Sequence, residues 1–326
     1  MIDIFTHAVP ERYKTALGQV APDLEKRVAG MPTLYDMDQR LRIMDKYENL
    51  KQVLTLSLTG GRVLENPRLA VDFAKLANDE MAELVAKYPD RFVGAAASLP
   101  MTDIDAGMKE LDRAIHELKM KGLQLFTPVM DKPLDSPEFV PFFARMAEYD
   151  LPVWIHPIRW MDRADYKALG ESKYYIYHIF GWPYETTAAM THLVFSGILD
   201  RFPGIKIIAH HCGGMVPYFE QKIVEAYNAS EIIHGLKYKH LISRPPIEYF
   251  KMFYGDTALN GSAAGLMCGY RFFAADHLLF ATDMPFDVEF GDRGIRKTIQ
   301  SVEALGLSAD EKKMVYEDNA KRLLHL

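Results

Sequence analysis

Eight short apolar segments, separated by stretches with helical periodicity, constrain the fold of this chain more than any other feature. They span residues 2–6, 52–58, 92–99, 122–126, 153–156, 205–211, 253–256 and 278–282. Their brevity, their β-branched and aromatic residues, and the glycines and prolines that follow many of them are typical of strands. Near-continuous apolar runs of this kind indicate parallel strands that are buried on both faces.

The segments between these strands carry apolar residues at the spacing of an amphipathic helix. The pattern predicts helices over 66–88, 103–120, 137–149, 186–201 and 310–324. Regular alternation of strand and helix indicates parallel βαβ units, and eight such units predict a closed barrel. An open doubly wound sheet is the alternative, but no glycine-rich phosphate fingerprint follows the first strand. We therefore predict an α/β fold, a (β/α)8 TIM barrel, with residues 1–326 forming a single domain.

Three connections are too long to be simple turns, namely 10–38, 158–185 and 215–251. Each follows a strand that ends in histidine, so we expect them to lie as long βα loops over the C-terminal face of the barrel. The second connection is rich in aromatic residues. Such a loop suits either the wall of a pocket for a planar substrate or an oligomer contact, and the sequence leaves both open.

The charge and cysteine content narrow the class of partner. A net charge of −6 gives no electrostatic reason to expect nucleic acid or a membrane surface as a partner. Two cysteines cannot form a disulfide framework, and the first strand begins at residue 2, so we expect a cytoplasmic protein without a signal peptide. Cys212 has no neighbour in the sequence that would activate a thiol, which favours a structural role.

Four predicted strands end in a residue that can bind a metal or move a proton. They lead to His7, to His156, to the pair His210–His211 and to Asp283. In a closed barrel the C-terminal ends of all strands meet at one face, where active sites are built. A single histidine of this kind is more often structural, and Asp283 alone is more often a cap. Together, two histidines and a carboxylate indicate a site for zinc or another divalent first-row metal.

The two adjacent histidines require a choice. Neighbouring residues in a strand point to opposite faces, so we expect only one of His210 and His211 to face the barrel mouth. Periodicity does not determine which one. A neutral histidine beside a metal is suited to acid–base catalysis.

The same residues resemble the amidohydrolase superfamily and, within it, the aminocarboxymuconate-semialdehyde decarboxylase family. The resemblance spans almost the whole chain, and it rests on the order and spacing of several short motifs. These are residues 2–7, 156–157, 181–186, 193–197, 202–206, 211–217, 254–257 and 282–286. It implies a (β/α)8 barrel that binds one divalent metal, zinc with manganese as the alternative. The implied ligands are His7, His156 and Asp283, with His211 rather than His210 as the acid–base residue.

The chain departs from the family pattern at Phe5, where the usual first-strand motif has a metal-binding histidine or glutamate. Phenylalanine supplies no ligand, so either a metal is retained through the other three residues or the site works without one. We favour retention, because three protein ligands and water are a normal catalytic arrangement. Strand 122–126 leads into Thr127 and Pro128 with no lysine. Since binuclear members of the superfamily carry a bridging lysine there, a mononuclear site is expected.

The leading hypothesis is therefore a carboxy-lyase that decarboxylates an unsaturated or aromatic carboxylic acid without oxidation, with His211 and Asp283 in acid–base catalysis. Phe5, Arg62 and Arg159 are candidate substrate-binding residues, since an arginine fork matches a carboxylate. A hydrolase or hydratase that uses metal-activated water on a lactone, amide or enol is the alternative. A catalytically inactive binding protein is the third hypothesis. We expect a small-molecule carboxylic acid as substrate and a homo-oligomer, dimer or tetramer.

Overall fold

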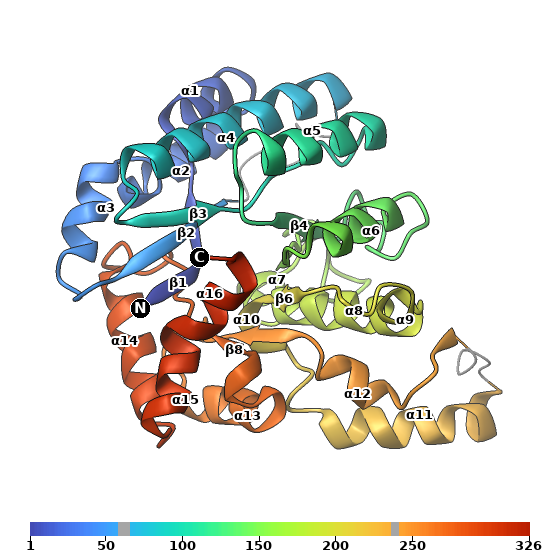
Figure 1. The fold of residues 1–326 in the computed structure, drawn as a ribbon. Helices are drawn as coiled ribbons and strands as arrows, with labels where there is room; N and C mark the ends of the chain where they lie inside the picture. The colour runs from blue at the N-terminus through green and yellow to red at the C-terminus, as the bar shows by residue number, and fades with distance from the viewer. Residues whose placement is uncertain (58–65, 236–240) are drawn as a thin grey trace. The chain divides into compact units, whose positions relative to one another are not determined.

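All eight predicted strands are present in the computed structural model, which describes residues 1–57, 66–235 and 241–326 (Figure 1). The strands are close to their predicted positions and are mostly shorter. They are β1 Ile2–Ala8, β2 Lys51–Leu56, β3 Phe92–Ala95, β4 Leu123–Thr127, β5 Val153–Pro157, β6 Ile207–Ala209, β7 Tyr254–Asp256 and β8 Leu278–Leu279.

The strands pair in the order of the chain. One sheet has the order β1-β2-β3 and the other the order β4-β5-β6-β7-β8, with parallel pairing wherever a register is defined. Beyond β3, Ala97 pairs in parallel with Leu123 of β4. Beyond β8, Thr6 of β1 pairs in parallel with Met284. This order of eight parallel strands with intervening helices is that of the predicted (β/α)8 barrel.

The predicted helices are also present, with shifted ends. They are α4 Pro67–Lys87, α5 Ile104–His116, α6 Val140–Tyr149, α8 Gly181–Phe195 with α9 Ile198–Arg201, and, at the C-terminus, α15 Ala309–Lys313 and α16 Asn319–Leu324 joined by a π-helical turn Met314–Asp318. N-cap side chains explain where two of these helices, α4 and α5, begin. Asn66 accepts a hydrogen bond from the Arg68 backbone at 3.1 Å before α4, and Asp103 accepts one from Ala106 at 3.0 Å before α5.

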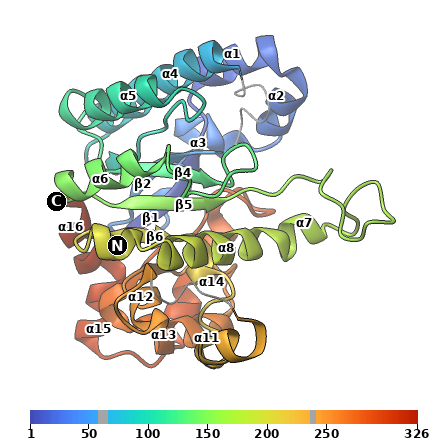
Figure 2. The same ribbon diagram turned by 90° about the vertical axis from the view of Figure 1, so that its right-hand side faces the viewer.

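Of the three long connections, the first and third contain helices, whereas the second is mostly irregular. The first contains α1 Glu11–Val20, α2 Pro22–Ala29 and the start of α3 Met37–Met44, while the third contains α11 Glu220–His234 and α12 Pro246–Phe250. Only 158–175 remains mostly irregular, and in Figure 2 it extends as an arm before the short helix α7 Ile176–Ile179. The helices α13 Ala263–Phe273 and α14 Asp292–Glu303 complete the later βα units.

The described residues form two compact units. One comprises residues 1–124, 257–266 and 279–326, and the other comprises 125–256 and 267–278. In the first unit β1 is buried along its whole length, and α4 packs against β3 and α5. In the second unit α8 packs against β5 and α12, over a core that includes Trp154, Phe142 and Phe250. None of the described helices has both the length and the apolar character needed to cross a membrane.

Gly214 marks a close approach inside the second unit. Its φ is +61°, and a Cβ atom there would lie 2.4 Å from the carbonyl oxygen of Pro183 in α8. The glycine that follows the histidine pair is therefore needed for both its conformation and its small size.

We expect Gly214→Ala to lower the free energy of unfolding by more than about 2 kcal/mol, because it adds backbone strain to a steric clash. Chemical denaturation of the two proteins measures the difference. Gly204→Ala is the matched control, since a Cβ atom at Gly204 would meet nothing within 4 Å. Equal stability of the two variants would contradict this interpretation.

Candidate functional site

The first unit brings two of the predicted metal ligands together. His7 lies near the C-terminal end of β1, and its Nε2 is 3.2 Å from Oδ1 of Asp283. The His7 ring is buried, whereas the Asp283 side chain is 19% exposed. On the other side of the ring, Nδ1 lies 3.2 Å from the hydroxyl of Thr55 in β2. The Thr55 contact fixes the orientation of the imidazole and directs Nε2 toward the carboxylate.

Asp283 reaches this position because the chain after β8 pairs with β1. The backbone N–H of Ile4 donates to Phe280 at 2.9 Å, and that of His7 donates to Met284 at 2.7 Å. Between them, the N–H of Asp283 donates to the carbonyl of Phe5 at 3.2 Å. Asp283 itself has φ +61°, so the chain turns at this residue and its side chain leaves the line of the strand.

Phe5 is a fully buried neighbour of the histidine rather than a ligand. Its ring centroid lies 5.4 Å from that of His7, and Phe286 contacts His7 from another direction at 5.3 Å. The ring contact fits the alternation of a strand, in which residues 5 and 7 point to the same face. Phe5 therefore replaces a ligating group by an apolar wall beside the imidazole.

Two buried charged side chains, Asp3 and Arg40, contact the chain next to Asp283 and at His7. The carboxylate of Asp3 accepts hydrogen bonds from the backbone and the hydroxyl of Thr282 at 3.0 and 2.5 Å. The guanidinium of Arg40, in α3, donates to the carbonyl of His7 at 2.6 Å and to Gln52 at 2.7 Å. Burial raises the pKa of Asp3 to about 7 and lowers the pKa of Arg40 to about 10. Neither residue was predicted from the sequence as part of the site.

The raised pKa of Asp3 predicts a specific pH dependence of stability. A carboxyl group that keeps its proton to about pH 7 in the folded state, but loses it near pH 4 when unfolded, favours folding most at low pH. We expect the free energy of unfolding, relative to Asp3→Asn, to fall from pH 4 to 7 and then level off. The slope is at most about 1.4 kcal/mol per pH unit.

Urea denaturation of both proteins between pH 4 and pH 9 tests this expectation. The asparagine keeps the size of the side chain and does not titrate, so the pH dependence of the difference reports the titration of Asp3. A difference that does not change over this range would contradict the assigned pKa.

The second unit contains the remaining predicted histidines. His156, at the end of β5, is buried, and its Nδ1 donates to the carbonyl of Pro157 at 2.8 Å. That bond leaves Nε2 as the nitrogen suited to bind a metal. The rings of Phe126 and Trp182 meet the imidazole edge-on, with centroids at 5.2 and 5.4 Å. Trp182 therefore packs against the imidazole of His156.

The structure overturns the argument about the two adjacent histidines. Strand β6 ends at Ala209, and His210 begins the short turn α10 His210–Gly213, in which His211 has φ +54°. The rule that neighbouring strand residues point to opposite faces therefore does not apply to His210 and His211. The centroids of their two rings lie 3.9 Å apart. His210 is fully buried, whereas His211 is partly exposed.

Asp256, the last residue of β7, organises this turn. Its Oδ2 lies 2.5 Å from Nδ1 of His210, and its Oδ1 accepts the backbone N–H of Cys212 at 2.9 Å. Asp256 lies in the motif of residues 254–257, but the sequence did not predict a role for it. The thiol of Cys212 is buried, which raises its pKa, so the geometry supports the structural role predicted for that cysteine.

Arg159, the candidate substrate-binding arginine of the second unit, lies in an ionic cluster. Its Nη1 is 2.8 Å from Glu185 Oε1, which Arg163 also contacts at 3.0 Å. Gly181 makes room for this side chain, because a Cβ atom there would lie 2.3 Å from Arg159 Cδ. Glu185 and Arg163 were not predicted as site residues. Arg62, the other candidate arginine, lies outside the described residues.

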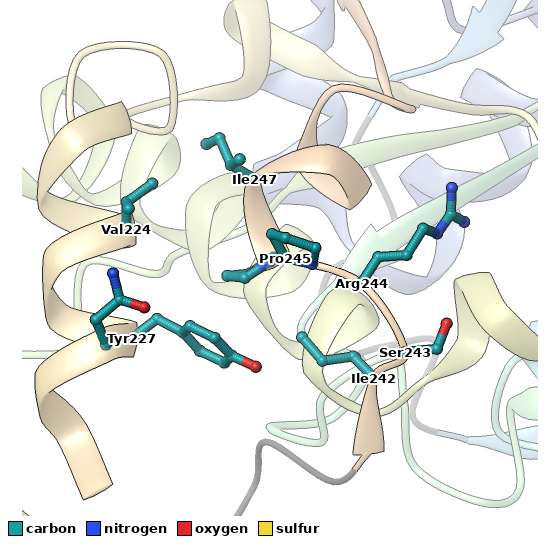
Figure 3. Close-up of a pocket in the computed structure, with 9 residues that line it drawn as sticks. Val224, Tyr227, Ile242, Ser243, Arg244, Pro245 and Ile247 are labelled. Carbon is teal, nitrogen blue, oxygen red and sulfur yellow. The ribbon is translucent and has the colours of Figure 1, made fainter. Parts of the chain in front are cut away.

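The described residues also line a cavity of about 330 Å³ elsewhere in the second unit (Figure 3). Val224 and Tyr227 of α11 face the segment 242–247 across it. Its lining contains none of the predicted site residues, so it does not bear on the chemistry described above.

Comparison with known proteins places the chain in a family. The sequence model of the amidohydrolase family matches residues 35–326, so the chain belongs to this family. The predicted resemblance is therefore confirmed.

Relatives with stated activities are decarboxylases. The chain is 29% identical to a gamma-resorcylate decarboxylase of Rhizobium sp. (strain MTP-10005), over 98% of this chain and 96% of the relative. It is 28% identical to a 2-amino-3-carboxymuconate-6-semialdehyde decarboxylase of Dictyostelium discoideum, over 77% and 67% of the two chains. These relatives support the predicted class of enzyme, a carboxy-lyase.

A solved structure extends the comparison to the metal. The dihydroxybenzoic acid decarboxylase of Polaromonas sp. JS666, with bound manganese and the inhibitor 2-nitroresorcinol, has a TM-score of 0.78 and 26% sequence identity. The match covers 100% of this chain and 96% of that one. The comparison supports a divalent metal in this fold and, for that relative, identifies it as manganese.

Proposed function

We propose that this protein is a metal-dependent decarboxylase of a hydroxylated aromatic carboxylic acid. The observation that carries the proposal is the pairing of His7 with Asp283 at 3.2 Å, at the strand ends where barrel enzymes build their active sites. The substrate class follows from the activities of the relatives with dihydroxybenzoate-type substrates.

The proposed metal ligands are His7, His156 and Asp283. These side chains fit a divalent first-row cation, because each histidine has one ring nitrogen committed to a neighbouring oxygen and the other available to a ligand. A cation bound there would act as a Lewis acid and orient the substrate oxygens. The resemblance of the sequence favours Zn²⁺ as the bound cation. The manganese bound to the relative makes Mn²⁺ an equally good candidate.

The residues of the chain supply the proton that replaces the carboxyl group. When the bond to the carboxylate carbon breaks, its electron pair stays on the ring carbon, which takes a proton as CO2 leaves. We assign delivery of that proton to Asp283, which is partly exposed, and its replenishment to His211, the partly exposed histidine of α10. Phe5 would pack against the aromatic ring of the substrate.

The direct test is activity of the protein freed of metal by chelation and reloaded with Mn²⁺ or Zn²⁺. We expect CO2 release from dihydroxybenzoates only after reloading, and at least 100-fold less activity for His156→Gln. The control is His192→Gln, which changes an exposed histidine of α8. Full activity without metal would overturn the proposal, and hydrolysis of lactones or amides without CO2 release would favour the alternative hydrolase.

A second prediction concerns the Arg159 cluster. Two guanidinium groups share the single carboxylate of Glu185, so these three side chains retain one positive charge that can bind a carboxylate substrate. We expect Arg159→Met to raise KM for the aromatic acid roughly 10- to 100-fold, the effect of losing a charged hydrogen bond. Arg163→Met, which changes the more exposed arginine, should change KM less than threefold. A reversed order of the two variants would contradict the assignment.

Three features of the proposal rest on the sequence. We propose that residues 1–326 act as one catalytic domain and that the protein forms a dimer or tetramer in the cytoplasm. The exposed aromatic residues of the arm before α7 suit an oligomer contact, since Tyr166 and Tyr174 are 73% and 87% exposed.

A further inference from the structure

His210 has the environment of a metal ligand, although the family pattern gives no ligand at its position. It is fully buried, and its Nδ1 lies 2.5 Å from the buried carboxylate of Asp256. A histidine that binds a metal commonly donates its other ring N–H to a carboxylate, which fixes the tautomer and makes the free nitrogen more basic. With Nδ1 directed at Asp256, Nε2 is the nitrogen that faces away from the carboxylate.

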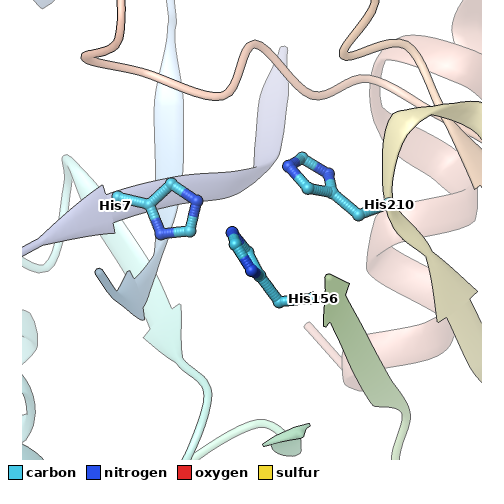
Figure 4. Close-up of side chains that lie close together, drawn as sticks. All are labelled: His7, His156 and His210. Carbon is cyan, nitrogen blue, oxygen red and sulfur yellow. The ribbon is translucent and has the colours of Figure 1, made fainter. Parts of the chain in front are cut away.

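The neighbour of His210 strengthens this interpretation. The rings of His156 and His210 lie face to face, with centroids 5.3 Å apart and an interplanar angle of 30° (Figure 4). Each offers a ring nitrogen, and the two nitrogens lie within 4.8 Å of each other. Two nitrogens that bind one cation at about 2.1 Å lie ~3.4 Å apart in tetrahedral geometry. The two nitrogens are therefore close enough for one cation to draw them together.

We propose that His210, held by Asp256, is a further ligand of the cation that binds His156. The inference rests on the proposed metal site and explains how a chain with Phe5 keeps a full set of ligands. Phenylalanine removes one ligand from the first strand, and His210 restores the number by adding an imidazole after β6. Asp256 is then a positioning residue, since it acts on the metal only through His210.

Binding of Mn²⁺ to the metal-free protein, measured by isothermal titration calorimetry, tests the proposal without reference to activity. We expect His210→Gln to weaken Mn²⁺ binding at least tenfold and Asp256→Asn to weaken it about tenfold, the range found when orienting partners are removed. We also expect the electron paramagnetic resonance spectrum of bound Mn²⁺ to change in His210→Gln.

The His192–Asp135 pair provides the matched control. It also joins a histidine Nδ1 to an aspartate carboxylate oxygen, at 3.0 Å and in the same unit of the fold, but its histidine is half exposed. His192→Gln and Asp135→Asn should leave Mn²⁺ affinity within twofold of the original protein. Melting temperatures without metal establish that each variant is folded. If His210→Gln does not fold, Asp256→Asn provides the second test, because it leaves the imidazole in place and removes only the carboxylate that orients it.

The outcomes separate this inference from the proposed function. If His156→Gln weakens Mn²⁺ binding while folded His210→Gln binds it as the original protein does, His210 is structural and the inference is wrong. The inference is equally wrong if folded Asp256→Asn binds Mn²⁺ as the original protein does. If the original protein binds neither Mn²⁺ nor Zn²⁺, the metal site itself fails, and the inference fails with it.

Discussion

The candidate site depends above all on the hydrogen bonds between β1 and the chain that follows β8. These bonds join residues almost 280 positions apart and bring Asp283 to 3.2 Å from His7. The buried pair Asp3 and Arg40 supports both sides of this junction, through Thr282 and through the carbonyl of His7. Burial of two charged groups is costly unless each is well bonded, so their presence here indicates a constraint on geometry rather than a gain in stability.

The three buried histidines are each held by a different kind of oxygen. His7 contacts the hydroxyl of Thr55, His156 the carbonyl of Pro157, and His210 the carboxylate of Asp256. In each case the contact is made through Nδ1, so it orients the ring. His210 differs from His7 and His156 in that its Nδ1 contacts a carboxylate.

The family relationship and the departure at residue 5 are compatible. Relatives with decarboxylase activity share the fold and most of the chain, and one of them binds manganese. Phe5 gives up a ligand and adds an aromatic wall to the same neighbourhood, where Phe286 also contacts His7. Relative to the family pattern, the change therefore alters the shape of the space beside the His7 imidazole.

The sequence by itself determined the eight strands and the residues at their ends, because apolar runs and helical periodicity depend only on local composition. It also predicted His7, His156 and Asp283 as site residues, since the rule that barrel sites lie at strand ends needs no coordinates. Only the tertiary structure decided the rest. The early end of β6 at Ala209 placed His210 and His211 in a turn. The contacts of Arg40 with His7, of Glu185 with Arg163 and of Asp256 with Cys212 join residues 22 to 44 positions apart. Such contacts depend on packing between elements, which leaves no periodic signal in the chain.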